Sequence, residues 1–441
     1  MLKINSIFQP YLMPGMRTFF LISLGQLISL IGSSLTKFAL GVWVYQQTGS
    51  ATQFAMITLF AQLPSILFSP LTGALVDRWN RRTAMLVSDC GAGLSTLAIA
   101  LLLLSGNIQI WYLYPIIAIG SIFNAFQLPA YQATVTLLVP KQHLVRVNSI
   151  VTLGLALSQL IVPFLGGILL IFIEIKGVFL IDFLTFLVAL TTLLIVKIPS
   201  HKNTIKKVAK KSLISETAYG WNYIAFRPGL LGLLLFYTSK NFCLGFVSVL
   251  TTPLALSFTT ADVLGKILSI GGIGMVVGSV VINIWGGRSR LIPTIVIFNV
   301  LGGIAIIIAG FSTEVPLLAF AAFSFFFTNP IVSSCYQTIW QKKVAPEVQG
   351  RVFAIRRAIA LGSLPLAYII AGPLADQIFE PLMLANGSLA DSVGLYIGVG
   401  PGRGIGLLFI IMGILAMLTS SIAYRYKPFR LLEAQLPDIG A

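Results

Sequence analysis

The sequence predicts an all-α membrane protein, with twelve transmembrane helices arranged as two pseudo-symmetric six-helix bundles. Hydrophobic residues make up 57% of the 441-residue chain and charged residues only 10%, with a mean hydropathy of +0.93. A soluble core of this size cannot bury so many apolar side chains. Runs of about 18 or more nearly uncharged residues recur along the chain, and each is long enough to cross a hydrocarbon core as a helix. These observations indicate a polytopic membrane protein.

The helical spans follow one another along the whole chain, separated by polar residues, glycine and proline. In the first half, the apolar runs predict helices near 18–46, 54–76, 84–105, 111–138, 148–172 and 176–196. In the second half, they predict helices near 230–252, 264–286, 291–311, 315–339, 354–376 and 403–424. We expect three parts: an N-terminal six-helix bundle over 1–196, a basic cytoplasmic linker over 197–229, and a C-terminal bundle with a cytoplasmic tail over 230–441.

Two connections are longer than the others. The linker contains a cluster of four lysines: Lys206, Lys207, Lys210 and Lys211. A basic amphipathic segment can lie on the anionic inner leaflet of a membrane. A solvated tether has the same composition, so the sequence leaves both interpretations open. The second long connection, 377–402, is rich in glycine and proline and is expected to face outside.

The distribution of basic residues sets the expected topology. The chain has 29 Lys and Arg against 13 Asp and Glu, a net charge of +16. When the N-terminus is placed in the cytoplasm, all but five of the 29 fall inside: Lys176, Lys266 and Arg403 lie outside, and Lys37 and Lys240 lie within helices. Cytoplasmic loops carry such an excess by the positive-inside rule. We therefore expect a multi-pass protein of the cell inner (plasma) membrane, with both termini cytoplasmic.

The two halves share a sequence pattern. Tyr131-Gln132 and Arg146 recur as Tyr336-Gln337 and Arg351, each 205 residues later. The prolines between them, Pro140 and Pro346, are separated by one residue more. Phe38-Ala-Leu-Gly41 matches Phe242-Cys-Leu-Gly245 at a separation of 204. The nearly constant offset indicates a duplicated six-helix unit. Two parallel repeats with a substrate path between them are the architecture of a secondary transporter.

A charged loop joins the second and third predicted helices. It reads Gly73-Ala-Leu75-Val-Asp77-Arg78-Trp-Asn80-Arg81-Arg82, and we refer to it as the latch loop. The glycine allows close helix approach, the Asp77 carboxylate can accept from a helix N-terminus or an arginine, and the arginines hold the loop at the interface. The loop resembles the signature of the major facilitator superfamily, Gly-x-Leu-x-Asp-Arg-x-Gly/Asn-Arg-Arg/Lys. The resemblance implies that Gly73, Asp77, Arg78, Arg81 and Arg82 latch the inner ends of the two halves.

Two features qualify this interpretation. A positive-inside loop that happens to contain one acid is the alternative to a latch. The corresponding loop of the second half, Trp285–Arg290, keeps glycine and arginine but has no acid, so only one latch is expected.

The predicted fifth helix carries a second motif, made of Ser158, Pro163, Gly166 and Gly167. It resembles a weakened antiporter motif of export-type superfamily members, Gly-x-x-x-Gly-Pro-x-x-Gly-Gly, with Ser158 and Val162 in place of glycine. Proline removes a backbone donor and small residues permit close packing, so the helix can bend there. Ordinary glycine and proline usage in a membrane helix would look the same.

Other segments resemble one branch of the superfamily. They are YQQTGSA, FQLPAYQATVTLLVP, IDFLTFLVA and GRVF…AGPLAD, and they are similar to the third drug:proton antiporter family, the macrolide-efflux and enterobactin-exporter-like branch. The resemblance implies a proton-coupled exporter of amphipathic small molecules, of drug, macrolide or siderophore type, that works by alternating access. It also implies no cofactor beyond the proton gradient and a functional monomer whose partners are the lipid bilayer and its substrate. A lysophospholipid carrier, which the branch also contains, remains the alternative.

Charged residues within predicted spans are costly in a membrane and are therefore candidate functional residues. Lys37 lies in the first helix without the acid that branch members often place a few residues earlier, and Lys240 lies near the middle of the seventh helix. Lys240 is expected to pair with an acid such as Asp182 or to meet an anionic group of the substrate. The alternatives are a snorkelling side chain for Lys37 and a purely structural partner for Lys240.

Three acids also lie within spans or at their ends. Asp89, in the third helix, is expected to pair with the arginines of the latch loop rather than to carry protons. Asp182, near the outer end of the sixth helix, is open between the two roles. Asp376, at the outer end of the eleventh helix, is expected to be solvated.

The substrate-binding wall is expected to combine aromatic and small polar residues. The candidates are Gln26, Asn124, Gln127, Tyr131, Tyr237, Asn241, Asn329 and Tyr336. Simple packing between helices is the alternative for each of them.

Other function classes are disfavoured by what the sequence lacks. No GxxxxGK[ST] nucleotide loop or metal-binding CxxC spacing occurs, and the two histidines, His143 and His201, fall in predicted loops. The three cysteines lie in apolar stretches and are expected to pack. No basic groove with interleaved aromatic residues suggests nucleic-acid binding. An intramembrane enzyme is therefore not expected, and no metal is expected either.

Reporter fusions test the topology. Fusions after the N-terminus, within 197–229 and at the C-terminus should all report a cytoplasmic location, because nearly all basic residues then lie inside. A periplasmic or extracellular signal from the 197–229 fusion would contradict the orientation.

Overall fold

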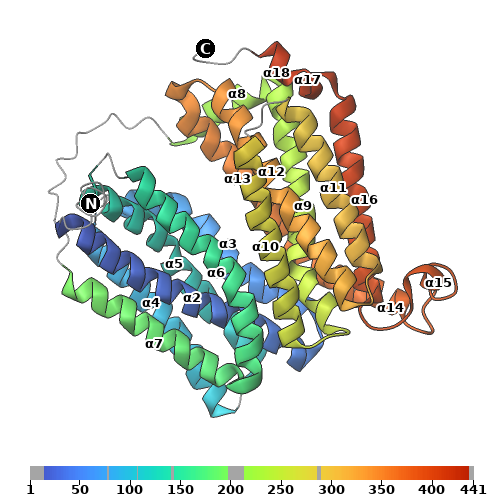
Figure 1. The fold of residues 1–441 in the computed structure, drawn as a ribbon, viewed down its shortest axis with the longest axis horizontal. Coiled ribbons are helices and arrows are strands. Elements are labelled where there is room, and N and C mark those ends of the chain that lie inside the picture. The colour runs from blue at the N-terminus through green and yellow to red at the C-terminus, as the bar shows by residue number, and fades with distance from the viewer. Residues whose placement is uncertain are drawn as a thin grey trace, which may run out of the picture. The chain divides into compact units, whose positions relative to one another are not determined.

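The computed structural model describes residues 14–76, 79–106, 108–140, 144–196, 213–285 and 290–436. These residues form helices without a strand, and twelve of the helices are long and apolar enough to cross a membrane (Figure 1). In the first half they are α2 (Pro14–Thr48), α3 (Ala51–Val76), α4 (Arg81–Ser105), α5 (Ile110–Leu138), α6 (Leu144–Phe172) and α7 (Glu174–Ile195). In the second half they are α9 (Pro228–Leu256), α10 (Ala261–Trp285), α11 (Leu291–Phe311), α12 (Val315–Lys343), α13 (Pro346–Pro373) and α16 (Arg403–Arg425). The predicted fold class is confirmed.

Most helices begin and end within a few residues of the prediction. The largest difference is α13, which begins at Pro346 rather than near 354. Proline is favoured in the first turn of a helix, so the helix continues into polar sequence that hydropathy alone does not assign to a span.

The chain divides into two compact units. The N-terminal unit contains Met1–Gln47 and Met56–Ile205, and the C-terminal unit contains Thr48–Ala55 and Lys206–Ala441. The short segment Thr48–Ala55, which includes the first turn of α3, therefore belongs with the second half of the chain. Within the predicted linker, Leu213–Ala225 forms helix α8, which packs against α9 and α13 of the C-terminal unit.

Small residues let the helices of the N-terminal unit approach closely. A Cβ on Gly91 of α4 would collide with the ring of Phe123 on α5, and one on Gly93 would lie 2.9 Å from the ring of Phe186 on α7. α4 therefore packs against both neighbours. Its N-terminus is capped by the Asn80 side chain, which accepts from the backbone N–H of Arg82 at 3.0 Å.

Glycines also let helices of the C-terminal unit approach closely, and there they face the backbone of the neighbouring helix. Cβ atoms on Gly274 and Gly278 of α10 would collide with the carbonyl oxygens of Phe323 and Phe327 on α12. A Cβ on Gly310 of α11 would lie 2.5 Å from a carbonyl oxygen of α16. Glycine at such crossings is typical of membrane helix packing.

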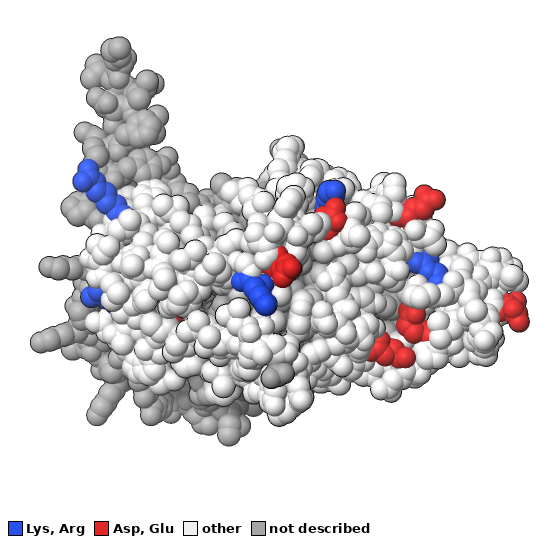
Figure 2. Space-filling view, turned by 90° about the horizontal axis from the view of Figure 1, so that it is seen from below, with Lys and Arg blue, Asp and Glu red and all other residues white. Residues whose placement is uncertain are grey.

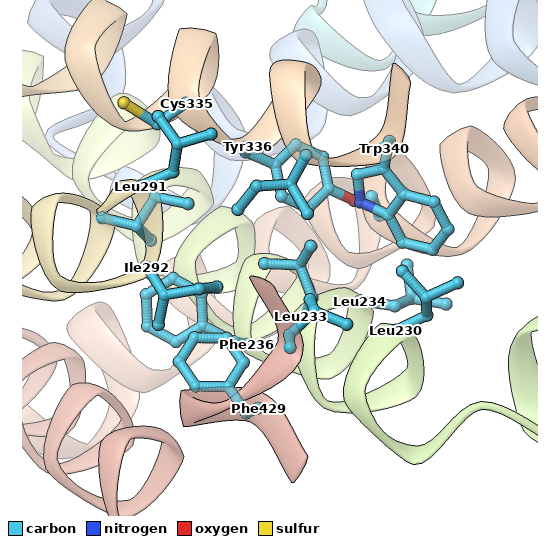
Figure 3. Packing of buried hydrophobic residues seen from close by; sticks show 14 of the residues in the cluster. Leu230, Leu233, Leu234, Phe236, Leu291, Ile292, Cys335, Tyr336, Trp340 and Phe429 are labelled. Carbon is cyan, nitrogen blue, oxygen red and sulfur yellow. The ribbon is translucent and has the colours of Figure 1, made fainter. Parts of the chain in front are cut away.

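The end of the chain completes one core of the C-terminal unit. Short helices α17 (Lys427–Arg430) and α18 (Leu432–Gln435) follow α16. Figure 3 shows Phe429 of α17 against Phe236 of α9, and their ring centroids are 5.6 Å apart. The Glu433 carboxylate accepts from the backbone N–H groups of Leu291 and Ile292 at 3.0 and 2.9 Å, which caps α11.

The predicted outer loop 377–402 is partly helical. A π-helical turn (η3, Leu374–Phe379) continues α13 and is followed by α14 (Glu380–Met383) and α15 (Gly394–Ile397). The Glu380 carboxylate accepts from the backbone N–H groups of Gly402 and Ile405 at 3.0 and 2.9 Å and so caps α16. Arg403 is buried and donates to the carbonyl oxygen of Ser312 at 2.9 Å.

The surface matches a lipid environment. Large apolar side chains such as Leu101, Phe172 and Ile284 are exposed on the membrane-spanning helices, and an apolar surface of this extent requires lipid to cover it. Figure 2 shows a face that is mostly uncharged, with a few charged side chains, some of which lie as adjacent pairs of opposite sign.

The glycine contacts predict a stability difference. Gly278→Ala should lower the melting temperature of the purified protein, because the new Cβ forces α10 away from α12, at a cost of about 1–3 kcal/mol. Gly362→Ala, where an added Cβ meets nothing within 4 Å, is the control and should be neutral or slightly stabilising. Equal melting temperatures for the two variants would contradict the packing assignment.

Candidate functional site

The N-terminal unit contains a cavity of about 440 Å³ between α2, α4, α5, α6 and α7. Much of its wall is apolar, with side chains such as Phe20, Leu27 and Phe186. Seven of the residues predicted from the sequence line this one cavity: Gln26, Lys37, Asp89, Asn124, Gln127, Tyr131 and Asp182. An apolar cavity with a few convergent polar groups is the usual form of a small-molecule site.

Asp89 stands at the end of a chain of side-chain amides. Gln26 on α2 donates through Nε2 to Oδ2 of Asp89 at 2.9 Å, and Gln127 on α5 donates to Oε1 of Gln26. Ser88 lies 2.7 Å from both Oε1 of Gln127 and the carbonyl oxygen of Phe123. Among the described residues, the Asp89 carboxylate is held by an amide from α2 and not by Arg81 or Arg82 of the latch loop. Arg78 lies outside the described residues.

Asp182 is almost completely buried and is held by hydroxyl groups. Ser33 on α2 donates to Oδ1 at 3.0 Å, and Thr96 on α4 donates to Oδ2 at 3.2 Å. Gly32 makes this contact possible, because a Cβ there would collide with the Thr185 hydroxyl on α7. α2 therefore approaches the helix that carries the acid.

Lys37 lies in the same cavity, within electrostatic range of Asp182. The sequence before Lys37 has no acid, and the compensating charge comes from α7 instead. Ser23 and Tyr131, on α2 and α5, also meet across the cavity wall, with their hydroxyls 2.7 Å apart. The polar groups of the cavity therefore link α2 to α4, α5 and α7.

In the C-terminal unit, the predicted residues form an aromatic stack with cations. The Lys240 ammonium donates to Oδ1 of Asn329 at 2.7 Å and lies 5.1 Å from the centre of the Tyr237 ring. Tyr237 stacks on Tyr336 at 3.7 Å, and the Arg356 guanidinium lies 5.2 Å from the Tyr336 ring. Within the C-terminal unit, the described partners of Lys240 are therefore an amide and a ring face.

Two of the predicted wall residues have structural contacts. Tyr336 and Asn241 are both buried, and Asn241 donates to the carbonyl oxygen of Ala360 at 2.8 Å. Arg356, which donates to Gln337 at 2.7 Å, was missed as a candidate. It could have been recognised from its position well inside a helix that begins at Pro346.

The latch loop is described only in part. Asp77 and Arg78, and the surroundings of Gly73, lie outside the described residues. Arg82 donates through Nε and Nη2 to the carbonyl oxygens of Leu193 and Leu194, at 2.9 and 2.6 Å. This arginine satisfies carbonyl groups at the end of α7 that have no partner within the helix. Arg81 begins α4 beside it.

The predicted antiporter-like segment forms the middle of α6. Ser158, Gly166 and Gly167 are buried, and Pro163 lies inside the helix. A Cβ on Gly166 would lie 2.5 Å from the ring of Phe38 on α2. The small residues therefore permit close packing of α6 on α2, the helix that carries Gln26 and Lys37.

The described residues contain no group of three or more His, Cys, Asp or Glu side chains placed to hold a metal. Cys243 and Cys335 are buried and Cys90 is half-buried, and all three are free thiols. The functional chemistry of the cavity therefore rests on carboxyl, amide, hydroxyl and ammonium groups.

Comparison with known proteins identifies the family. Residues 22–363, which include most of the residues that line the cavity, match the Major Facilitator Superfamily. The chain belongs to the major facilitator superfamily. Its relatives include macrolide efflux protein A of Streptococcus pyogenes, 26% identical over 364 residues that cover 82% of this chain and 90% of the relative. The multidrug efflux pump Tap of Mycolicibacterium fortuitum is 23% identical and is covered to 86%, against 78% of this chain.

The superfamily fold is confirmed by a solved structure. The inward-facing, unoccupied structure of a bacterial homolog to the human lysosomal transporter Spinster matches with a TM-score of 0.71 at 13% identity. The match covers 96% of this chain and 98% of that one. This likeness establishes the fold. The efflux relatives agree with the drug-efflux branch of the superfamily that the sequence motifs indicated.

A double-mutant cycle tests the Asp182 site. Asp182→Asn should lower the melting temperature by an amount equivalent to about 1–3 kcal/mol, because the amide satisfies fewer of the donors around it and Lys37 loses its compensating charge. Lys37→Gln in the same protein should recover part of this loss. Strictly additive effects would show that the two groups are not coupled.

Proposed function

We propose that this superfamily member is a secondary active transporter that exports amphipathic small molecules, of drug, macrolide or siderophore type, in exchange for protons. It acts as a monomer in the plasma membrane, with both termini in the cytoplasm, by alternating access. The observation that carries the proposal is the cavity of the N-terminal unit, where an apolar wall surrounds two acids and one lysine. The names of the efflux relatives support export.

The cavity suits an amphipathic substrate. Leucine and phenylalanine side chains from several helices line it, and an apolar body gains free energy by leaving water for such a wall. Asn124 and Tyr131 add neutral hydrogen-bonding groups. Because two carboxyl groups face one ammonium group, the cavity favours neutral or cationic compounds over anionic ones. This balance is less suited to a lysophospholipid with an anionic headgroup.

Asp89 is the proposed proton carrier. The described partner of its carboxylate is the neutral amide of Gln26, so a proton can be gained without breaking an ion pair. Protonation would convert one carboxyl oxygen from an acceptor into a donor and rearrange the chain from Gln26 to Gln127. Asp182, in contrast, has the Lys37 charge nearby and serves to keep that lysine in the cavity.

Transport by the purified protein in proteoliposomes tests the proposal. A pH gradient should drive uptake of a labelled macrolide or siderophore, and a labelled lysophospholipid should not respond. Asp89→Asn should reduce gradient-driven transport at least tenfold while substrate exchange without a gradient continues, because only the proton-carrying step is lost.

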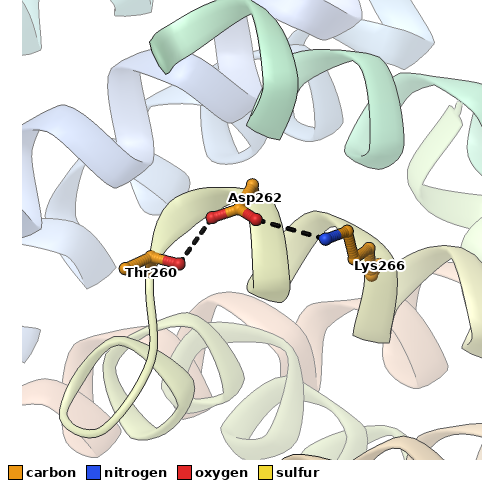
Figure 4. Close-up of polar contacts among 3 residues, drawn as sticks. All are labelled: Thr260, Asp262 and Lys266. Carbon is orange, nitrogen blue, oxygen red and sulfur yellow. Dashed lines mark hydrogen bonds and ion pairs between the residues drawn. The ribbon is translucent and has the colours of Figure 1, made fainter.

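Asp262→Asn is the matched control. Asp262 forms an exposed ion pair with Lys266 at 3.3 Å beside Thr260 at the start of α10 (Figure 4). An exposed pair of this kind contributes little, so transport should be unchanged. Gradient-driven transport by Asp89→Asn at the normal rate would refute the coupling role. Transport of the lysophospholipid alone would replace the drug-exporter proposal with the lipid carrier.

A further inference from the structure

Asp376 of the C-terminal unit is held by donors of the same unit. Its carboxylate accepts from the backbone N–H groups of Ala51 and Thr52 at 3.0 and 2.8 Å. It also accepts from the Ser50 hydroxyl at 2.6 Å. The sequence led us to expect a solvated Asp376, and that expectation is wrong. A Cβ on Gly372 would lie 2.5 Å from Cα of Thr52, so the backbone is closely packed around the acid.

The other described acids of this unit are also held by neighbours or lie at the surface. Glu380 and Glu433 accept from the backbone N–H groups that begin α16 and α11. Asp262 forms an ion pair with Lys266 at 3.3 Å. The remaining described acids are exposed: Glu314, Glu347 and Asp391. None of these carboxylates forms an ion pair with a cation inside the helix bundle of the unit.

Two cations within the unit, Lys240 on α9 and Arg356 on α13, therefore have no described acid as a partner. The Lys240 ammonium donates to the side-chain amide of Asn329. The Arg356 guanidinium donates through Nη2 to the amide of Gln337, and the groups within its electrostatic range include a second cation, Arg357. A charge within a membrane span is costly unless an opposite charge compensates it. The two side chains thus leave an excess of positive charge.

A stack of two tyrosine rings joins the cations. The Lys240 ammonium lies 5.1 Å from the centre of the Tyr237 ring, which stacks on Tyr336 at 3.7 Å. The Arg356 guanidinium lies 5.2 Å from the centre of the Tyr336 ring and within electrostatic range of both phenol groups. Tyr237 and Lys240 are one turn apart on α9, so both lie on one face of that helix. We call Tyr237, Lys240, Tyr336, Trp340 and Arg356 the cationic cluster.

Three buried polar groups of the cationic cluster have no hydrogen-bond partner. They are the Tyr336 hydroxyl, the Trp340 indole N–H and Nη1 of Arg356. Tyr336 and Trp340 are only 4% and 0% exposed, and Figure 3 shows the tyrosine ring pointing toward the indole. The Arg356 guanidinium lies 5.4 Å from the Trp340 ring. Buried polar groups in proteins are almost always paired, so three unmatched groups together mark a site for an acceptor.

The chemistry of these groups specifies the ligand. Lysine, arginine and indole groups donate and cannot accept, so the ligand must offer lone pairs, and the two cations favour a negative charge. A carboxylate provides both, and its two oxygens match the geometry of a guanidinium group. The ring of Phe353, 4.6 Å from the Arg356 guanidinium, adds an apolar surface for the body of an organic acid. Tyr237, Lys240 and Arg356 are only half-buried and form the side by which a ligand can enter.

We propose that Lys240, Arg356 and the Tyr336 hydroxyl form a binding site for the carboxylate of an organic acid. The site lies within the C-terminal unit and is built from residues other than those of the N-terminal cavity, where two acids disfavour an anion. The inference goes beyond the exporter function and does not depend on it, because binding to the purified protein is measured without transport.

Equilibrium binding of radiolabelled benzoate to the purified full-length protein tests the site. We expect saturable binding that unlabelled benzoate displaces, and that chloride or phosphate at the same ionic strength displaces only weakly. Arg356→Gln and Lys240→Gln should each raise the Kd roughly tenfold, because each removes a charge-assisted hydrogen bond. Arg356→Lys keeps the charge but loses the planar fork of donors, so its Kd should rise less.

Tyr336→Phe separates contact with the ligand from a structural role. It keeps the ring stack and removes a hydroxyl that has no described partner, so the melting temperature of the ligand-free protein should not fall. The Kd for benzoate should nevertheless rise roughly threefold, because the ligand loses a donor. Lys266→Gln removes an exposed cation of the same unit and should leave the Kd unchanged. If Arg356→Gln fails to fold, Lys240→Gln and Tyr336→Phe provide the test.

A wild-type protein that binds no benzoate would overturn the proposal, and so would an unchanged Kd in the folded variants of the cationic cluster. An equal rise in Lys266→Gln would overturn it too, since binding would then reflect general attraction to a basic protein. Displacement by chloride or phosphate as effective as that by benzoate would replace the carboxylate with an inorganic anion. The exporter proposal fails separately: proteoliposomes that transport no labelled compound leave the benzoate result unaffected.

Discussion

The structure depends on how acids are satisfied inside a lipid-facing helix bundle. A carboxylate within a membrane is strongly disfavoured unless hydrogen-bond donors surround it. Asp89 and Asp182, within the spans, meet this requirement with neutral donors rather than with an ion pair at contact distance. Asp376, Glu380 and Glu433 are likewise held by neutral donors, at helix ends. Each acid thereby ties its own helix to another, and these ties determine where the cavity and the helix ends lie.

The groups that donate hydrogen bonds to the acids differ between the two units. In the N-terminal unit, Asp89 and Asp182 are held by side-chain amides and hydroxyls, which can rotate about their side-chain bonds. In the C-terminal unit, Glu380 and Glu433 are held by the backbone N–H groups of helix starts, which cannot rotate. The adaptable set lines the cavity, whereas the fixed set secures helix ends.

Close helix approach through small residues supports both kinds of contact. Gly32 brings Ser33 of α2 to Asp182 of α7, and Gly372 of α13 brings Asp376 of η3 to α3. Larger side chains at either glycine would separate the helices and leave the acids without donors. The polar contacts of the cavity and of the helix ends are therefore consequences of glycine packing, as much as of the acids themselves.

The sequence predicted which residues form the candidate site better than it predicted their contacts. The cost of charge in a membrane pointed to Lys37, Asp89 and Asp182 without any tertiary information, and all three line one cavity. Among the described residues, Asp89 is held by the amide of Gln26 across the bundle, a partner that its position along the chain near the latch loop did not predict.

The sequence by itself determined that the chain crosses the membrane as twelve helices, because each span is a local property: about 20 apolar residues in a row satisfy their own backbone hydrogen bonds. Only the tertiary structure decided which donors meet the acids. The partners Gln26 of Asp89, Ser33 of Asp182 and Ser50 of Asp376 are 63, 149 and 326 residues away along the chain. Their meeting depends on the rotation and register of packed helices, which side-chain packing sets and which hydropathy does not encode.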